Sequence, residues 1–419
     1  MRIIVITDDF YPNKGGVAHT LMNFYKFSKK NQLNVTIINP FINKNDFLKK
    51  LNKRIKNLKI LSIECFKAIN FNIFIILISR LLFNKDINFV DRIKMIIYLF
   101  YRPKLTLNIL NNLKKIFYYL KNTEFDFILA SHGGWIFILS FLLSNYFNKK
   151  LILMAHGDDF LVKSPLTMRT YYFKYTNKII LSNQIMKKLI KKIHHLNENQ
   201  LQVINRGIVI QKMEIKENRI KLRKLFNIPN DIFVILSVGR HVPRKNFSLV
   251  IKAIKKIVET YPNIKIRYYL IGKGKETQNL KDLRKKLNLD KYVFFLGTVD
   301  FEKRNKFYKL SDIFVMPSDI KNNSIEGFGI VFLEANYYKL PIIGGDTGGI
   351  RAAIIDGLNG FLINPKNIND LVEKILLFYK NEDLRLKMGE RGHLRVINNY
   401  SWNTIINEFI SLFKNLVEN

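Results

Sequence analysis

The chain has 419 residues, which is long for one compact core and fits two α/β domains better. Hydrophobic residues make up 48% of the composition, which excludes a wholly disordered protein. The one cysteine, Cys65, excludes an intrachain disulfide framework and fits a reducing compartment.

The formal net charge is +36, from 69 Lys and Arg residues against 33 Asp and Glu. Basic proteins attract nucleic acid, anionic lipid or acidic substrates. The richness in Lys, Asn, Ile and Phe is also typical of an AT-rich genome, which would explain the charge without any partner. Because the lysines are scattered through the chain, we expect no dedicated nucleic-acid domain.

The N-terminal segment predicts a strand followed by a ligand-facing turn. Residues 1–9 contain a short apolar run that ends in acidic residues, which favours a buried strand over a signal peptide. Gly15 and Gly16 follow, and a glycine turn between a strand and a helix lets backbone amides contact a phosphate or a sugar. Residues 34–38 predict the second strand.

The region that follows is basic and apolar. From Phe47 to Lys59, apolar residues recur at helical spacing with cations between them. Such a helix either lies on an anionic membrane or packs its apolar face on its own domain. The apolar segment from Phe71 to Phe83 is too short to span a bilayer and contains Arg80, so we predict no transmembrane helix.

Further strands are predicted at 125–130, 151–154 and 178–182, and another from Gln202. The strand at 151–154 runs into His156, and a histidine just past a strand end is often only a satisfied polar residue. The basic stretch 212–224 marks a domain boundary.

The second half opens with a predicted strand at 233–238, followed by Gly239, Arg240 and Lys245. Arginine offers a bidentate fork and lysine a point charge, which together suit a diphosphate. The alternative is a solvated basic turn in a lysine-rich chain. Strands are also predicted at 268–271, which leads to Gly272, and at 293–299, which ends at Val299. The glycines after the former strand lack the third glycine of a dinucleotide motif, so NAD binding is not supported.

The most informative segment joins a predicted strand at 313–316 to Glu326-Gly327-Phe328-Gly329-Ile330 and to Glu334. If the backbone between the two glutamates is helical, they lie roughly 12 Å apart on a similar face. That span suits a ligand with hydroxyl groups at both ends and phosphates between them, as in a nucleotide sugar. Pro341 predicts that the helix ends near residues 338–339.

The segment EGFGIVFLEA resembles the E-x7-E signature of retaining family-4 glycosyltransferases. The resemblance implies an α/β GT-B fold, in which two Rossmann-like domains with parallel sheets face each other across a cleft. Residues 1–205 would form the N-terminal, acceptor-side domain, and residues 206–399 the C-terminal, nucleotide-sugar-binding domain. The C-terminal helix, residues 400–419, would pack back on the first domain.

The resemblance also implies roles for single residues. Arg240 and Lys245 would contact the donor phosphates, Glu326 and His156 the donor sugar, and Glu334 the ribose hydroxyls. Other donor-binding positions would be Gly15, Gly16, Gly239, Gly272, Val299, Gly327, Phe328, Gly329 and Ile330.

The implied function is a retaining transfer of a sugar from a UDP- or GDP-linked donor to a hydroxyl of a glycan or lipid-linked acceptor. It would serve cell-envelope polysaccharide, lipopolysaccharide or glycolipid synthesis. We expect no metal and no cofactor, because the chain lacks the Asp-x-Asp of metal-dependent transferases. We also expect a cytoplasmic location, with an anionic membrane surface as a partner and no nucleic acid. The alternatives are a sugar-nucleotide epimerase or phosphorylase of the same fold, or a basic membrane- or nucleic-acid-binding protein without activity.

Overall fold

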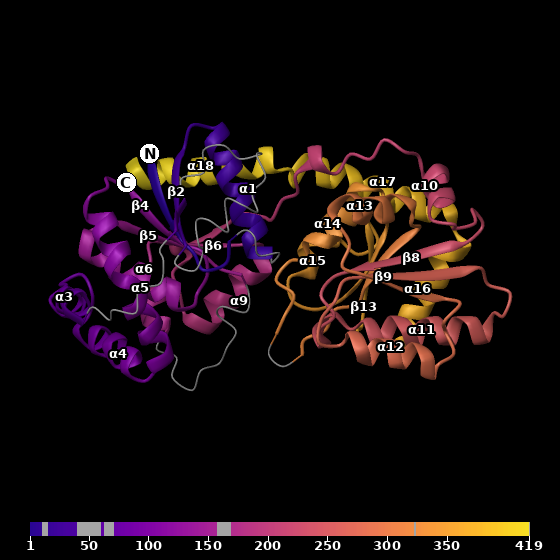
Figure 1. Cartoon of the computed structure of the whole chain (residues 1–419), viewed down its shortest axis with the longest axis horizontal. Coiled ribbons are helices and arrows are strands. Elements are labelled where there is room, and N and C mark those ends of the chain that lie inside the picture. The colour runs from indigo at the N-terminus through magenta and orange to yellow at the C-terminus, as the bar shows by residue number, and fades with distance from the viewer. Residues whose placement is uncertain (11–15, 40–59, 63–70, 157–168, 322–323, 419) are drawn as a thin grey trace. The chain divides into compact units, whose positions relative to one another are not determined.

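The computed structural model describes residues 1–10, 16–39, 60–62, 71–156, 169–321 and 324–418. The chain forms two compact units, of which the first comprises Met1–Asn205 with Ile406–Asn419 and the second comprises Arg206–Ile405. Both contain a parallel sheet with helices packed against it (Figure 1). The predicted site residue Gly15 and the predicted helix from Phe47 to Lys59 lie outside the described residues.

The sheet of the first unit has seven parallel strands in the order β3-β2-β1-β4-β5-β6-β7. Its core strand β1 is buried on both faces, which explains why its sequence is a continuous apolar run rather than an alternating one. The strands are β1 Arg2–Ile6, β2 Asn34–Asn39, β3 Ile60–Ser62, β4 Phe127–Ala130, β5 Lys150–Met154, β6 Lys178–Leu181 and β7 Leu201–Val203.

The helices of the first unit include one from the far end of the chain. In that helix, α18, Phe409 lies 5.0 Å from Phe24 between ring centroids, and Phe413 lies 6.1 Å from Phe127. Lys150 also donates a hydrogen bond of 2.6 Å to the carbonyl of Leu416. The helices are α1 Gly16–Lys30, α3 Phe71–Leu82, α4 Phe89–Phe100, α5 Pro103–Lys121, α6 Trp135–Phe147, α8 Arg169–Lys174, α9 Gln184–His194 and α18 Trp402–Glu418.

The sheet of the second unit has six parallel strands in the order β10-β9-β8-β11-β12-β13. The strands are β8 Phe233–Val238, β9 Ile266–Ile271, β10 Val293–Gly297, β11 Ile313–Met316, β12 Ile342–Gly345 and β13 Gly360–Ile363. The helices are α10 Arg219–Leu225, α11 Phe247–Thr260, α12 Thr277–Lys286, α13 Phe301–Leu310, α14 Ile330–Tyr337, α15 Ile350–Ala353, α16 Ile368–Lys380 and α17 Glu382–Asn399.

In each sheet the strand order reverses once, between β1 and β4 in the first unit and between β8 and β11 in the second. The register fixes these pairs, with Ile4 opposite Ile128 and Leu236 opposite Phe314. In open parallel sheets, ligands bind beyond the carboxyl ends of the strands at such a reversal. In the first unit, the loops after β1 and β4 are therefore the candidate place for a ligand, and in the second unit the loops after β8 and β11.

Two features differ from the sequence expectations or extend them. The strand predicted to reach Val299 ends at Gly297, where the backbone turns to a φ of 68°. The short strands β3 and β13 were not predicted.

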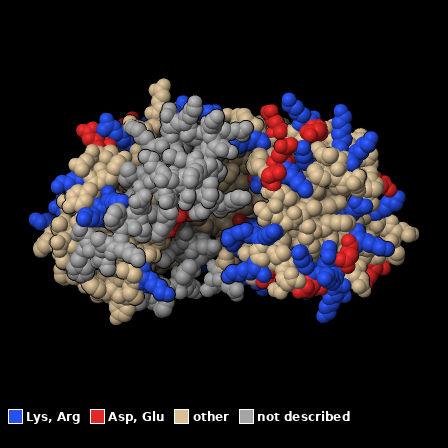
Figure 2. Space-filling model, viewed as in Figure 1, with Lys and Arg blue, Asp and Glu red and all other residues tan. Residues whose placement is uncertain are grey.

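No helix in the described parts of the chain is long and apolar enough to cross a membrane. On the visible face, Lys and Arg side chains are spread widely rather than gathered in one patch (Figure 2).

Candidate functional site

The loop after β8 carries the two predicted phosphate ligands in different environments. Gly239 follows the strand, the Arg240 side chain is exposed, and the Lys245 side chain is buried within the short helical turn Pro243–Lys245. Gly272, at the end of the neighbouring β9, has a φ of 133°, and a Cβ atom there would lie 1.9 Å from the carbonyl oxygen of Gly239. Only glycine therefore allows these two strand ends to approach so closely.

Lys245 pairs with Glu326, which follows β11. The lysine Nζ lies 2.6 Å from Oε2 of Glu326, and Arg244 Nε lies 3.7 Å from the same oxygen. Burial raises the pKa of Glu326, but the charges of Lys245 and Arg244 outweigh it and hold that pKa below its ordinary value of 4.5. Burial lowers the pKa of Lys245, and Glu326 opposes this shift. The two groups form a buried ion pair at the strand reversal of the second sheet.

The backbone around Glu326 is fixed by the next loop along the sheet. The N–H of Gly349, after β12, donates a hydrogen bond of 2.8 Å to the carbonyl of Glu326. Thr347 Oγ1 donates a hydrogen bond of 2.9 Å to the carbonyl of Ser318, which follows β11. The loops after β8, β11 and β12 are thus joined into one structure at the carboxyl edge of the sheet.

The backbone from Glu326 to Glu334 is not helical throughout, so the condition for a spacing of roughly 12 Å is not met. Helix α14 begins at Ile330, because Gly329 has a φ of 83°, which an α-helix cannot contain. A Cβ atom on Gly329 would lie 2.5 Å from the Phe332 ring, so the position requires glycine. The predicted end of the helix is confirmed, since α14 ends at Tyr337 and Lys339 has a φ of 60°.

The other predicted residues of the second unit differ in how far they are buried. Phe328 is 3% exposed and its ring lies 5.8 Å from that of Tyr400, so its side chain belongs to the core. Gly327 is partly exposed, and Ile330 is the first residue of α14. Val299 is partly exposed in the loop after β10.

Glu334 lies in a hydrogen-bond network of its own. It is 5% exposed, and its two carboxylate oxygens accept from Arg304 at 2.9 Å and from Tyr308 at 3.0 Å, both on α13. Burial raises the pKa of Tyr308 well above its ordinary value, and the Glu334 charge adds to that shift. The structure thus brings Lys245 and Glu326 together, while Glu334 contacts a different set of residues.

In the first unit, His156 follows β5 and its Nε2 donates a hydrogen bond of 2.8 Å to the carbonyl of Ser131, after β4. This contact connects two neighbouring strand ends at the carboxyl edge. Gly16 is the first residue of α1, and a Cβ atom there would meet nothing within 4 Å, so packing does not require glycine at this position.

The sequence analysis missed a cluster at the strand reversal of the first sheet. His132 Nε2 lies 2.5 Å from Oδ1 of Asp8, and Trp135 Nε1 donates a hydrogen bond of 2.8 Å to Oδ2. The N–H of Gly134 donates to His132 Nδ1 at 3.0 Å, which leaves the ring proton on Nε2. Burial raises the pKa of Asp8, but His132 and Trp135 lower it below its ordinary value. The signal available in the sequence was the position of Asp8 directly after an apolar strand.

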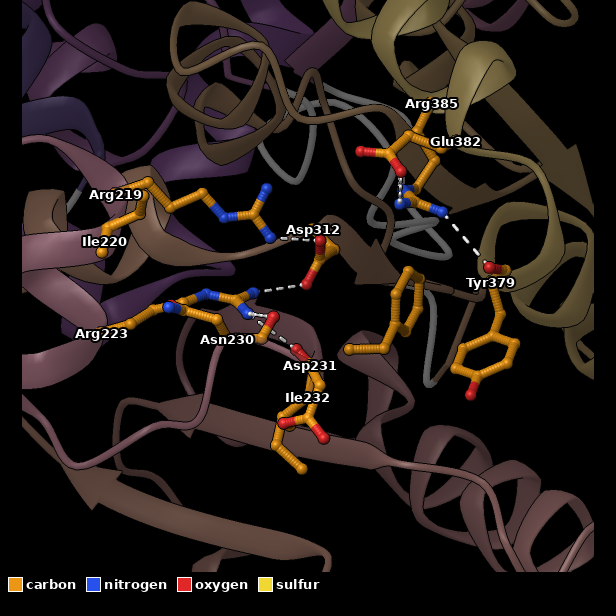
Figure 3. A pocket seen from close by; sticks show the side chains of 11 residues that line it. Arg219, Ile220, Arg223, Asn230, Asp231, Ile232, Asp312, Tyr379, Glu382 and Arg385 are labelled. Atoms are coloured by element: carbon orange, nitrogen blue, oxygen red, sulfur yellow. Dashed lines mark hydrogen bonds and ion pairs between the residues drawn. The ribbon is translucent and has the colours of Figure 1, made fainter.

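A cavity of about 530 Å³ lies at the opposite, amino-terminal edge of the second sheet (Figure 3). Arg223 and Asp312 both line it. Arg223 donates a hydrogen bond of 2.7 Å to Asp312, which also accepts one of 2.7 Å from the N–H of Val234. None of the predicted site residues lines this cavity, and its buried ion pair ties the start of β8 to the start of β11. Within the described residues, no group of three or more His, Cys, Asp or Glu side chains could hold a metal ion.

The sequence of this chain is similar to those of known proteins. The family model for Glycosyl transferases group 1 matches residues 218–395, which include both predicted glutamates and both predicted phosphate ligands. An uncharacterised glycosyltransferase of Methanocaldococcus jannaschii is 33% identical over 265 residues, covering 62% of this chain and 67% of that protein. The capsular polysaccharide biosynthesis glycosyltransferase CapM of Staphylococcus aureus is 28% identical over 250 residues, covering 59% of this chain and 63% of that protein.

Among solved structures, Anabaena HepE in complex with UDP-glucose matches with a TM-score of 0.74 at 17% identity. The match covers 99% of this chain and 100% of that one. The predicted α/β GT-B fold is confirmed by this likeness and by the two parallel sheets.

Proposed function

Since the chain belongs to the family of group 1 glycosyl transferases, we propose that it transfers a hexose from a nucleotide-sugar donor to a hydroxyl group of an acceptor. The donor would bind at the carboxyl edge of the second sheet. UDP-glucose is the first donor to test, because the HepE structure with a similar fold contains it. The acceptor in this proposal is a glycan or a lipid-linked molecule at the cytoplasmic side of a membrane. The similarity to CapM, which is named for capsular polysaccharide biosynthesis, supports the part of the proposal that concerns polysaccharide synthesis.

The contact between Lys245 and Glu326 carries the proposal. The lysine is the candidate for a donor phosphate and the glutamate for the donor sugar, and the two groups lie 2.6 Å apart. In a nucleotide sugar, the anomeric carbon and the adjacent phosphate are joined through one oxygen, so their ligands must also be neighbours. An ammonium group has three protons, so Lys245 can donate to Glu326 and to a phosphate oxygen together.

The reaction we propose retains the anomeric configuration. The acceptor oxygen forms its bond to the anomeric carbon on the face from which the phosphate oxygen departs, and the departing diphosphate takes the acceptor proton. Arg240, with an exposed guanidinium group, and Lys245 would stabilise the charge on the leaving group. Each such donor is worth on the order of 10²–10³ in rate.

Metal independence is part of the proposal. The two cations after β8 would supply the positive charge that a divalent ion supplies in other transferases. Activity should then survive excess EDTA. Complete loss of activity that magnesium or manganese restores would contradict this model of donor binding.

The experiment that tests the function is a thermal-shift screen of UDP- and GDP-sugars, followed by product analysis. A ligand at 100 times its dissociation constant adds about 2.7 kcal/mol of stability, which is readily detected. The anomeric configuration of the transferred sugar is then read by NMR. Formation of a free epimer or of a sugar phosphate, instead of a glycoside, would contradict the proposal.

A further inference from the structure

Three consecutive helices of the first unit, α3, α4 and α5, lie between β3 and β4 in the sequence and pack against one another. Figure 1 shows α3 and α4 together at the rim of this unit. The side chains of α4 fall into two sets. Met95, Tyr98 and Leu99 are at most 1% exposed and face the unit. The opposite face is not polar, as it would be in an ordinary surface helix.

The outward face of α4 is apolar along its whole length. Phe89 is 62% exposed and Phe100 is 74% exposed, and Ile93 and Ile97 lie between them, partly exposed. Residues three or four apart lie on the same side of a helix, so these four side chains form one stripe. Tyr101 follows directly after the helix, is 65% exposed, and extends the apolar stripe.

Helix α3, which packs beside α4, has the same character. Its inner face buries Ile73, Leu77 and Leu81, while Ile75 is 49% exposed. Phe83, directly after the helix, is 79% exposed. We call the exposed apolar side chains of this pair the α3–α4 face: Ile75, Ile76, Phe83, Phe89, Val90, Ile93, Ile97, Phe100 and Tyr101. Single exposed apolar residues are common, but several of them on two adjoining helices indicate an interaction surface.

The charges around the α3–α4 face are almost all positive. Residues 71–107 contain two acidic residues, of which Asp91 is buried and bonded to Lys174 at 2.9 Å. The other is Asp86. The basic residues of the same range are Arg80, Lys85, Arg92, Lys94, Arg102 and Lys104. An apolar face whose helices carry mainly cations is complementary to a bilayer with acidic headgroups.

We propose that the α3–α4 face docks on an anionic lipid bilayer, with Phe83, Phe89 and Phe100 inserted at the boundary between the headgroups and the acyl chains. The charges favour this partner over a second copy of the chain, because two copies joined through this face would bring like charges together. The inference rests on the membrane placement in the proposed function. It uses no residue of the candidate site, so the binding can be tested without any donor or acceptor.

The test is co-sedimentation of the full chain with vesicles of equimolar phosphatidylglycerol and phosphatidylcholine, or of phosphatidylcholine alone. The test variant carries Phe83→Ser, Phe89→Ser and Phe100→Ser. The matched control carries Ile220→Ser, Leu225→Ser and Leu386→Ser, which change three side chains of the second unit that are 64%, 60% and 61% exposed. Because all six positions are exposed, the fold should survive, and circular dichroism checks this.

We expect the wild-type protein and the control to bind the anionic vesicles and the test variant to bind at least tenfold more weakly. Equal binding by test and control variants, or no binding by the wild type, would overturn the proposal. A wild-type dimer in the absence of lipid that the test variant converts to monomer would instead assign the face to self-association, and would also overturn it.

A second measurement separates insertion from simple adsorption. The Phe100→Trp substitution places an indole on the α3–α4 face, and quenching of its emission by bromine-labelled phosphatidylglycerol reports contact with the acyl chains. We expect quenching beyond that of the wild-type protein, whose tryptophans are Trp135 and Trp402. Quenching equal to the wild-type value would refute insertion of Phe100. If glycosyl transfer is absent while these binding results hold, the proposed function fails and the membrane surface stands.

Discussion

Lys245 Nζ lies 2.6 Å from Oε2 of Glu326, a residue 81 positions further along the chain, and both side chains are buried. A buried carboxylate needs such a partner, because the cost of removing an unpaired charge from water is large. The pair therefore joins the loops after β8 and β11 in addition to any role in binding a donor. These two contributions can be separated by experiment.

The first prediction compares Lys245→Ala with Arg240→Ala. Both should lower turnover by roughly 10²-fold or more, because each removes a cation from the donor phosphates. Lys245→Ala should also lower the free energy of unfolding of the second unit by about 3–5 kcal/mol, because it leaves Glu326 buried without its lysine. Arg240 is exposed, so its replacement should change stability by less than about 0.5 kcal/mol.

Unfolding of the second unit can be followed in urea by the emission of Trp402, in a Trp135→Phe background. Near-normal rates in both alanine variants would contradict the phosphate assignment. Unchanged stability of Lys245→Ala would contradict the role of the buried pair.

The second prediction concerns the double variant Lys245→Met, Glu326→Leu. Replacing a buried ion pair by apolar groups of similar size is often neutral or stabilising. We therefore expect the double variant to recover most of the stability lost in Lys245→Met alone, while its turnover stays low. Recovery of transfer together with stability would show that the pair only supports the fold.

The third prediction distinguishes Glu326 from Glu334. Glu326→Ala should lose transfer but keep much of its affinity for the free nucleoside diphosphate, which has no sugar to contact. Glu334→Ala should bind that nucleotide more weakly, because the ribose hydroxyls lose the carboxylate that accepts their hydrogen bonds. Glu373→Ala, at a side chain that is 69% exposed, serves as the control. Calorimetry that gives the reverse order would exchange the two roles.

The fourth prediction follows from His241, which is 1% exposed. Burial lowers the pKa of this ring to about 4, from an ordinary value of 6.5. The unfolded chain therefore binds a proton at higher pH than the folded one, and the stability of the second unit should fall as pH drops from about 6.5 to about 4. His241→Phe should remove this part of the slope. A urea-unfolding series showing the same slope in both proteins between about pH 7 and about pH 5 would rule the effect out.

The fifth prediction tests the cluster at Asp8 in the first unit. In Asp8→Asn, the amide cannot accept from both His132 and Trp135, so one partly buried donor loses its partner. We expect the first unit to lose about 1–3 kcal/mol, measured through Trp135 emission in a Trp402→Phe background. Unfolding of the second unit, followed as above, should not change. A loss in both units, or in neither, would contradict this assignment.

Much of the fold could be predicted because both sheets are parallel. A strand buried on both faces reads as a continuous apolar run, and β1, β8 and β11 were recognised in this way. The edge strands β3 and β13 have three and four residues, with apolar runs of two and three residues, which are too short to indicate a strand. The end of α14 was predictable from Pro341, whose effect on the backbone is local.

The candidate site was predictable as a set of residues but not as a geometry. The glycines around Phe328 indicated a turn. The sequence could not show that α14 begins only after Gly329, because this depends on how closely Gly329 packs against the Phe332 ring. The pairing of Lys245 with Glu326 joins residues far apart in the sequence, as does the contact between Asp8 and His132. Such contacts follow from strand order, and single-residue patterns do not encode strand order.

The placement of α18 has a consequence for how this protein is made. Phe409 and Phe413 complete a core whose strands lie between residues 2 and 203, yet the whole second unit is synthesised in between. At about 5–20 residues per second, the ribosome needs roughly 10–40 s to cross that interval. During this time Phe24 and Phe127 lack their final packing partners, so the nascent first unit should be the one that chaperones hold. The half that leaves the ribosome first is thus the last to be finished.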